Sequence, residues 1–175
     1  MKGSDADMKC LILYSSMTGN TKKLAETVHR QLDGLVPMQT VKEAVDFSKY
    51  DTLCLGYWIK KGGCDKVTKK VWENIHGKRI VLFGTMAADV NSELGKSQME
   101  RIEKALPADN NIVAHFACQG AMSAEALEQY RDKVEQEPFN DLAQAILDNA
   151  MNCSGHPDKM DELNLMRDVQ YAIGR

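Results

Sequence analysis

Hydroxyl and amide side chains surround one glycine in the segment YSSMTGNT, residues 14–21. Gly19 has no Cβ, so the backbone there can approach a bulky anion. The side chains that can donate a hydrogen bond to such an anion are Ser15, Ser16, Thr18, Asn20 and Thr21. The segment lies between an apolar run and a helical pattern, where the unpaired N–H groups and the dipole of a helix N-terminus attract negative charge. These features predict a phosphate-binding loop.

The absence of a lysine from this loop narrows the kind of phosphate. Residues 14–21 contain neither the G-x-x-x-x-G-K-[ST] pattern of nucleotide triphosphatases nor the G-x-G-x-x-G turn of dinucleotide-binding proteins. Neutral donors favour a terminal monophosphate. The alternative interpretation is that these residues only cap a helix, but a single hydroxyl would be enough for that role.

The loop must be positioned by the strands around it. Four short, almost continuously apolar segments predict central strands of a parallel sheet, buried on both faces: residues 10–14, 52–57, 80–85 and 112–118. Residues 36–41 mix polar and apolar side chains and contain Pro37, which lacks an N–H group for the ladder. They predict the second strand along the chain, at the edge of the sheet.

Helical periods separate these strands and continue after the last one, with apolar residues spaced three or four apart. The apolar faces are Leu24, Val28 and Leu32; Val67, Val71 and Ile75; Met99, Ile102 and Leu106; Leu127, Tyr130 and Val134; Phe139, Leu142, Ile146 and Ala150; and Met160, Leu163, Met166, Val169 and Ile173. The alternation predicts an α/β fold with a doubly wound parallel sheet and helices on both faces. Its ligand site is expected outside the carboxyl ends of the strands, where the strand order reverses.

Length and charge limit the remaining possibilities. The 175 residues predict a single domain, with residues 1–8 a disordered start or tag and residues 154–175 an appended C-terminal helix. The net charge is −3 and no block of like charges occurs, which argues against a nucleic-acid partner. No apolar run approaches the roughly 18 residues of a membrane span, so a cytoplasmic protein without a membrane partner is expected. The five cysteines and four histidines show no metal-ligand spacing, and no metal site is predicted.

The phosphate-binding loop resembles the FMN-phosphate loop of flavodoxins, whose pattern is roughly [TS]-x-T-G-x-T. The residues that meet this pattern are Ser16, Met17, Thr18, Gly19, Asn20 and Thr21. The resemblance covers about residues 9–150. It implies a five-stranded parallel sheet of order 2-1-3-4-5, here followed by extra C-terminal helices, and noncovalent binding of FMN.

A finer resemblance follows from four further motifs, which are YW-x-x-K-G, FGT, C-Q-G and an HP before the last helix. The chain is similar in these to a flavodoxin-like group of which some members are associated with bilirubin-reducing enzymes of anaerobic bacteria. The resemblance implies two flavin-contacting loops. The first contains Tyr57, Trp58, Ile59, Gly62 and Gly63, and the second contains Thr85, Met86 and Ala87. Flavodoxins often place a tyrosine in the second loop, and this chain has none there.

Three features of residues 57–63 each have two open interpretations. Trp58 would stack on the flavin, or it is an ordinary half-buried aromatic side chain. The Gly62–Gly63 peptide would turn a carbonyl toward the flavin, or it is a flexible turn. Lys60 and Lys61 would favour negative charge on a reduced flavin, or they are solvated charges. The last helix is either extra packing or a lid and docking surface near the flavin.

The expected function is an FMN-binding electron carrier that serves a redox partner protein, either a reductase or an acceptor enzyme, as a monomer or weak homodimer. No catalytic nucleophile with its base is evident, so the chemistry would reside in the cofactor. The alternatives are an FMN-dependent reductase acting directly on a quinone or tetrapyrrole-like substrate, and a flavin-free interaction module that accompanies an oxidoreductase.

Overall fold

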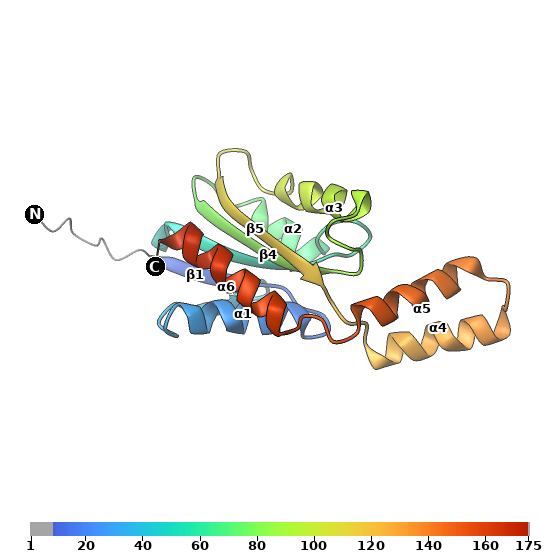
Figure 1. Ribbon diagram of the computed structural model, residues 1–175. Helices are drawn as coiled ribbons and strands as arrows, with labels where there is room; N and C mark the ends of the chain where they lie inside the picture. Colours follow the sequence, from blue (N-terminus) through green and yellow to red (C-terminus); the bar gives the residue numbers. More distant parts are fainter. Residues whose placement is uncertain (1–8, 175) are drawn as a thin grey trace, which may run out of the picture.

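Five parallel strands form one sheet in the computed structural model, which describes residues 9–174 (Figure 1). The predicted start or tag at residues 1–8 lies outside the described residues. The strands are β1 (Cys10–Tyr14), β2 (Met38–Thr40), β3 (Thr52–Trp58), β4 (Arg79–Met86) and β5 (Asn111–Gln119). Their order is β2-β1-β3-β4-β5, so the predicted doubly wound sheet of order 2-1-3-4-5 is confirmed. Strand β2 lies at the edge, as Pro37 indicates.

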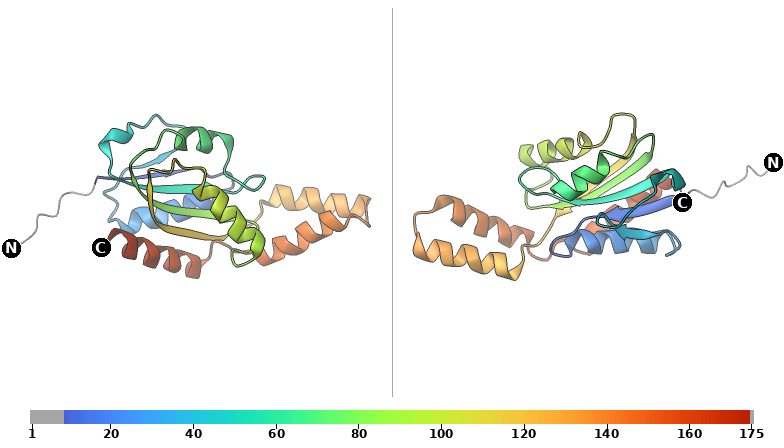
Figure 2. Two further views of the ribbon diagram at one scale, coloured as in Figure 1. Left: turned by 90° about the horizontal axis from the view of Figure 1, so that it is seen from above. Right: turned by 180° about the vertical axis from the view of Figure 1, so that it is seen from behind.

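In the described part of the chain, six α-helices accompany the sheet: α1 (Asn20–Gln31), α2 (Lys66–Trp72), α3 (Glu93–Glu103), α4 (Ala124–Gln136), α5 (Asp141–Cys153) and α6 (Lys159–Ile173). A short 3-10 helix, η1 (Phe47–Lys49), precedes β3. Helices α1 and α6 cover one face of the sheet, and α2 and α3 cover the other (Figures 1 and 2). Two apolar clusters fill the spaces between these layers, one containing Leu24 and Val169 and the other containing Trp72 and Ile102. None of the helices in residues 9–174 has the length and apolar character needed to cross a membrane.

Strand β5 differs from the prediction of burial on both faces. Most of its residues are only partly buried, and Phe116 and Cys118 are the buried ones. The reason is the strand order: β5 pairs only with β4 and forms the second edge of the sheet. The apolar residues of β5 therefore reflect contact with the helices that cover the sheet more than burial of the strand on both faces.

Two helices bury only part of their predicted apolar faces. On α2, Thr68 and Trp72 are buried, whereas Val67 is 46% exposed. On α6, Leu165 and Val169 are buried, while Met160 and Leu163 are exposed. Ile75 of the first predicted face and Val169 and Ile173 of the second are buried as predicted, so the prediction is wrong only at the start of each helix.

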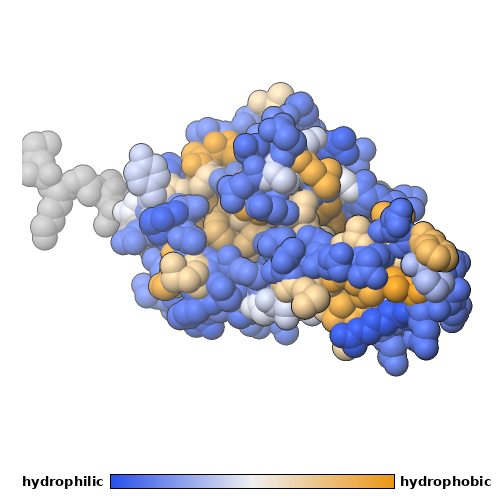
Figure 3. Space-filling view, turned by 45° about the vertical axis from the view of Figure 1, so that its right-hand side comes forward, coloured by the Kyte–Doolittle hydropathy of each residue, from blue (hydrophilic) through white to orange (hydrophobic). Residues whose placement is uncertain are grey.

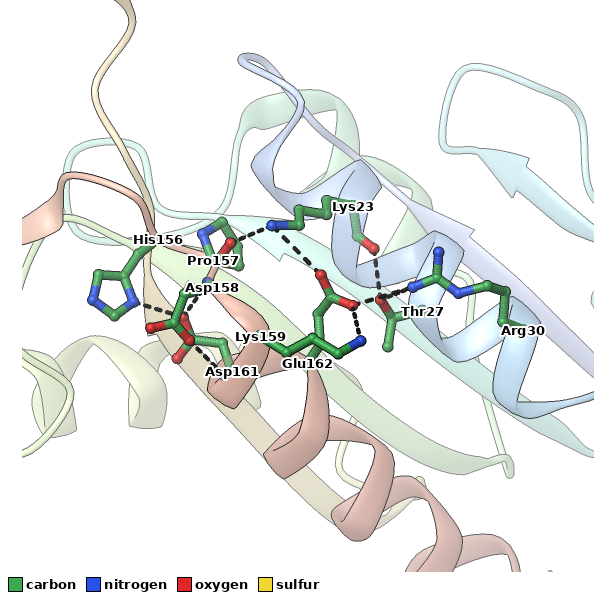
Figure 4. Close-up of polar contacts among 9 residues, drawn as sticks. All are labelled: Lys23, Thr27, Arg30, His156, Pro157, Asp158, Lys159, Asp161 and Glu162. Carbon is green, nitrogen blue, oxygen red and sulfur yellow. Dashed lines mark hydrogen bonds and ion pairs between the residues drawn. The ribbon is translucent and has the colours of Figure 1, made fainter.

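Glu162 on α6 lies among cationic side chains, two of them on α1 (Figure 4). Glu162 is 7% exposed, and its carboxylate accepts hydrogen bonds from Arg30 at 3.2 Å and Lys159 at 3.4 Å. Lys23 lies 3.4 Å from the same carboxylate and also donates to the Pro157 carbonyl. Because Lys23 and Arg30 are on α1, these contacts tie α6 to α1. The segment predicted as an appended helix thus lies against the sheet beside α1.

The α4–α5 hairpin, residues 124–153, projects away from the sheet beyond the end of β5 (Figures 1 and 2). No residue of α4 is buried, and the buried residues of α5 are Ala143, Ala150 and Cys153. Phe139 at the turn is 96% exposed. Figure 3 shows hydrophobic residues gathered on this projecting part. The hairpin is therefore joined to the body of the molecule mainly at its base.

Candidate functional site

A cleft of about 130 Å³ opens at the carboxyl ends of the strands. It brings together most of the residues predicted to bind a cofactor, from three separate parts of the chain. Those lining it are Ser16, Met17, Thr18, Asn20, Thr21, Trp58, Ile59, Thr85, Met86 and Ala87. Strand pairing explains the meeting, because Tyr14 of β1 is level with Gly56 of β3 and Trp58 is level with Thr85 of β4.

The loop from Ser16 to Gly19 leads into the first turn of α1, and Ser16 closes it with hydrogen bonds. Gly19 has a left-handed φ of 93° and precedes the first turn of α1. The Ser16 hydroxyl oxygen accepts from the N–H groups of Gly19 and Lys22, each at 3.2 Å, so its hydrogen remains available to a ligand. Thr18 is exposed. A ligand anion would meet these hydroxyls together with the positive end of the helix dipole.

Three of the predicted donors are engaged with other parts of the protein. The buried Thr21 hydroxyl donates to the Tyr57 carbonyl at 3.1 Å and lies 3.0 Å from the Thr85 hydroxyl. Ser15 donates to Asp65 at 2.8 Å. The Asn20 amide donates to the Ala121 carbonyl at 2.8 Å. These side chains position the loop, whereas Ser16 and Thr18 line the cleft and, within residues 9–174, make no such contact with another part of the fold.

Trp58 forms an apolar wall of the cleft, and its orientation is fixed from behind. Its indole N–H donates to the Ser15 hydroxyl at 3.2 Å, and Ser15 in turn donates to Asp65. Burial acts to raise the pKa of Asp65, but hydrogen bonds from Thr68 and Ser15 outweigh it and hold that pKa below its usual value. The Asp65 carboxylate therefore anchors, through Ser15, the two successive hydrogen bonds that orient the Trp58 indole. The Lys60 ammonium lies 5.6 Å from the centre of the indole ring.

The KKGG segment forms a tight turn beside the cleft. Lys60 and Gly63 exchange two backbone hydrogen bonds of 2.7 and 3.2 Å, and Lys61 and Gly62 both have positive φ. Gly62 and Gly63 do not belong to the lining of the cleft in the described part of the chain. They lie near a second cavity of about 520 Å³, whose walls include Lys60, Lys61 and Cys64.

Tyr57 contributes its backbone to the site and its side chain to the core. The phenol is fully buried and lies 2.7 Å from Nε2 of His115, whose Nδ1 is 2.8 Å from the Glu103 carboxylate. Burial raises the pKa of Tyr57, and burial lowers the pKa of His115 despite the opposing effect of Glu103. Tyr57 therefore reaches the cleft only through the carbonyl that accepts from Thr21.

Two residues of the cleft are not predicted from the sequence, Gly120 and Ala121. They follow β5, and Gly120 donates to the Met86 carbonyl at 2.9 Å. A side chain at Gly120 would meet the Asn20 amide at 2.9 Å and Thr85 at 3.2 Å, so the backbone must approach closely there. The available signal was the C-Q-G motif, which ends the fifth strand at the same edge as the other loops.

Within residues 9–174, three possible metal ligands come together, His156, Asp158 and Asp161. Asp158 and Asp161 form a capping box at the start of α6, and His156 lies 2.6 Å from the Asp161 carboxylate. These contacts account for the cluster as a helix cap.

Comparisons with known proteins agree with this geometry. The chain matches the model of the flavodoxin domain family over residues 11–170. It is 41% identical over 158 residues to the flavodoxin-like domain-containing protein BilS of Clostridioides difficile (strain CD3), covering 88% of this chain and 90% of the relative. A BilS protein of Clostridium symbiosum (strain WAL-14163) is 31% identical over 172 residues, with coverages of 88% and 90%.

Two solved structures share the fold. One is a short-chain flavodoxin associated with a non-canonical PDU bacterial microcompartment, with a TM-score of 0.53, 15% identity, and 95% of this chain and 98% of that chain covered. The other is a putative flavoprotein from Bacteroides uniformis ATCC 8492, with a TM-score of 0.51, 18% identity, and coverages of 71% and 97%.

Proposed function

This chain belongs to the flavodoxin family, and from that premise we propose that it binds FMN noncovalently in the cleft and transfers electrons to or from a partner oxidoreductase. One observation carries the proposal: the Ser16–Thr21 loop and the Trp58 indole line the same cleft. An anion-binding helix terminus and an apolar ring face are the two surfaces that a phosphorylated planar cofactor requires.

The residues present fit this cofactor. Ser16, Thr18 and the first N–H groups of α1 would hold the phosphate, as neutral donors suit a terminal monophosphate. Trp58 and the buried Met86 would contact the ring system. When bound, FMN would supply the chemistry of accepting and releasing one or two electrons.

The protein's own groups would then orient the cofactor and adjust its charge environment. Asp65 and Ser15 hold the indole of Trp58 in place, and Thr21 holds the phosphate loop against β3. Lys60 and Lys61 place positive charge next to Trp58 and favour added negative charge on the ring. The one-electron potentials of the bound cofactor therefore depend on this loop.

The thiols near the site support a carrier over an enzyme with a protein nucleophile. Burial raises the pKa of Cys118 and of Cys153. Burial, followed by the charge of Asp65, also raises the pKa of Cys64. Such thiols are poor nucleophiles at neutral pH.

We also propose that the protein acts in the cytoplasm, as a monomer or weak homodimer without a nucleic-acid or membrane partner.

A second candidate function is an FMN-dependent reductase that acts directly on a quinone or tetrapyrrole-like substrate. The observation that favours it is the cavity of about 520 Å³ beside the KKGG turn. Its lining combines the apolar Val67 with three lysines and one carboxylate, Asp65, and this excess of positive charge suits a planar molecule bearing carboxylates.

Reconstitution with FMN tests these functions together. We expect a yellow protein whose FMN affinity falls by at least about a hundredfold in Ser16→Ala combined with Thr18→Ala, since each hydrogen bond to a charged phosphate contributes about 1.5 to 3 kcal/mol. Unchanged affinity would remove the loop assignment, and a protein that binds no FMN would support the flavin-free module. Turnover of a quinone with NAD(P)H alone would favour the reductase over the carrier.

A further inference from the structure

The Ala87 carbonyl, at the wall of the cleft opposite the phosphate loop, accepts hydrogen bonds from three side chains. The donors are Gln119 Nε2 at 3.1 Å, Asn149 Nδ2 at 2.9 Å and Cys153 Sγ at 3.3 Å. A carbonyl oxygen has two lone pairs, so three donors saturate it. Convergence of this kind fixes the plane of the peptide that joins Ala87 to Ala88.

Two of the donors belong to the projecting hairpin. Asn149 and Cys153 are four residues apart on α5, so they lie on the same face of the helix one turn apart. Both amides also approach the thiol, Gln119 Nε2 at 3.4 Å and Asn149 Nδ2 at 3.6 Å. Through Asn149 and Cys153, the base of the hairpin thus contacts a backbone carbonyl of the candidate cofactor site.

The rest of the loop after β4 does not explain this attachment. Residues Asp89 to Ser92 are closed by local bonds, from Asn91 N–H to the Asp89 carboxylate and from Ser92 to the Asp89 carbonyl. Met86 is held by Gly120. Within residues 9–174, the side-chain hydrogen bonds that join this loop to α5 are those at Ala87, so a shift of α5 would move the Ala87 carbonyl.

We propose that Gln119, Asn149 and Cys153 are positioning residues for the cofactor, which fix the Met86–Ala87 wall of the cleft and couple the α4–α5 hairpin energetically to cofactor binding. This inference rests on the proposed FMN function. Coupling between two sites is reciprocal. Loosening the base of the hairpin weakens FMN binding, and bound FMN stabilises the base of the hairpin.

Asn149→Asp is the sharpest test, because it keeps the shape of the side chain while replacing the donor with an oxygen that repels the Ala87 carbonyl. Asn152→Asp is the matched control: it introduces the same charge on the same helix at an exposed position. We expect the FMN dissociation constant to rise about tenfold in Asn149→Asp, as for the loss of a well-formed hydrogen bond. In Asn152→Asp it should change less than about twofold.

Cys153→Ala and Cys153→Ser give a second comparison, since serine restores a donor and alanine does not. Cys153→Ser should bind FMN more tightly than Cys153→Ala and should show a flavin absorption spectrum closer to that of the parent. This pair keeps the test available if Asn149→Asp fails to fold.

Hydrogen exchange measures an effect of FMN that would be absent if Gln119, Asn149 and Cys153 had a purely structural role. In the parent, adding FMN should slow exchange of the amides at residues 146–153, whereas in Asn149→Asp this protection should be lost. Equal FMN affinity and equal protection in parent and Asn149→Asp would overturn the coupling while leaving the proposed function intact. A parent that binds no FMN would overturn both proposals, and the reconstitution experiment identifies that case first.

Discussion

The Thr21 hydroxyl donates to the Tyr57 carbonyl at 3.1 Å, which pins the first turn of α1 to the end of β3. The bond lies in the core, and the same hydroxyl is 3.0 Å from that of Thr85 on β4. Since Trp58 directly follows Tyr57, this contact sets the distance between the anion-binding loop and the aromatic wall. One threonine of α1 thereby contacts two strands, β3 and β4, at the cleft.

Thr21→Val should separate positioning from direct binding. The change removes the hydroxyl, keeps the shape, and removes the hydrogen bond from Thr21 to the Tyr57 carbonyl. We expect the free energy of unfolding to fall by about 1 to 2 kcal/mol and FMN affinity to fall with it. Thr18→Val, at an exposed position of the same loop, should weaken FMN binding with little loss of stability. Urea denaturation and fluorescence titration measure the two effects, and equal stability of both variants would reject the distinction.

Trp58→Ala should release the flavin emission that stacking on the indole quenches, and it should weaken FMN binding. Ser15→Ala should give a smaller change in the same direction, because it removes the hydrogen bond that orients the indole and leaves the ring in place. The measurement is the quantum yield of bound FMN. If Trp58→Ala binds FMN with the affinity and the weak emission of the parent, the indole does not contact the ring.

Lys60→Gln combined with Lys61→Gln should lower the second one-electron potential of bound FMN and affect the first less. Positive charge near the ring favours the more negative reduced form, and solvent screening limits the effect to tens of millivolts, on the order of 1 kcal/mol. Lys69→Gln with Lys70→Gln on α2 is the control of equal charge. Redox titration at low salt is the measurement, and a second potential that stays constant or rises would show that the lysines act only as solvated charges.

Gly62→Ala and Gly63→Ala should differ in their effect on stability. Gly62 has a φ of 82°, and an added Cβ would lie 2.8 Å from the Arg101 guanidinium, whereas a Cβ at Gly63 meets no atom within 4 Å. Left-handed backbone costs a non-glycine residue about 1 kcal/mol. Thermal denaturation should show a clear loss for Gly62→Ala and almost none for Gly63→Ala. Equal melting temperatures would contradict the turn geometry.

Glu162 should make the packing of α6 on α1 sensitive to acid. Burial acts to raise the pKa of Glu162, but hydrogen bonds and charge from Lys159 and Lys23 outweigh it and hold that pKa below the usual 4.5. Because the folded pKa is the lower one, the stabilisation is complete above pH 4.5 and is lost as the pH falls below that value. Glu162→Gln should therefore be less stable than the parent at pH 7. Between pH 5 and 3, the stability of Glu162→Gln should fall less than that of the parent. Glu26→Gln, in an exposed pair with Lys22, is the control. Parallel pH profiles of parent and Glu162→Gln would contradict this assignment.

Local pattern was enough to predict the elements and the place of the site. The apolar runs at residues 10–14 and 52–57 and the proline before β2 indicate strands and their exposure, because burial leaves a period in the sequence. The Ser16–Thr21 loop could be recognised because its donors, its glycine and the helix it begins are adjacent along the chain. Parallel strands end at one edge, so Trp58 and Met86 could be placed beside that loop.

The partners of individual polar groups were decided only by the tertiary structure. Thr21 is 36 residues from Tyr57, Asn149 is 62 residues from Ala87, and Glu162 is 132 residues from Arg30. A hydroxyl that suits a phosphate also suits a buried carbonyl, and nothing local distinguishes the two. Likewise, an apolar stripe on α6 is compatible with several rotations until the cations of α1 select the one that pairs Glu162. Periodicity records whether a residue is buried, whereas a hydrogen-bond partner depends on which distant segment the fold brings within about 3 Å.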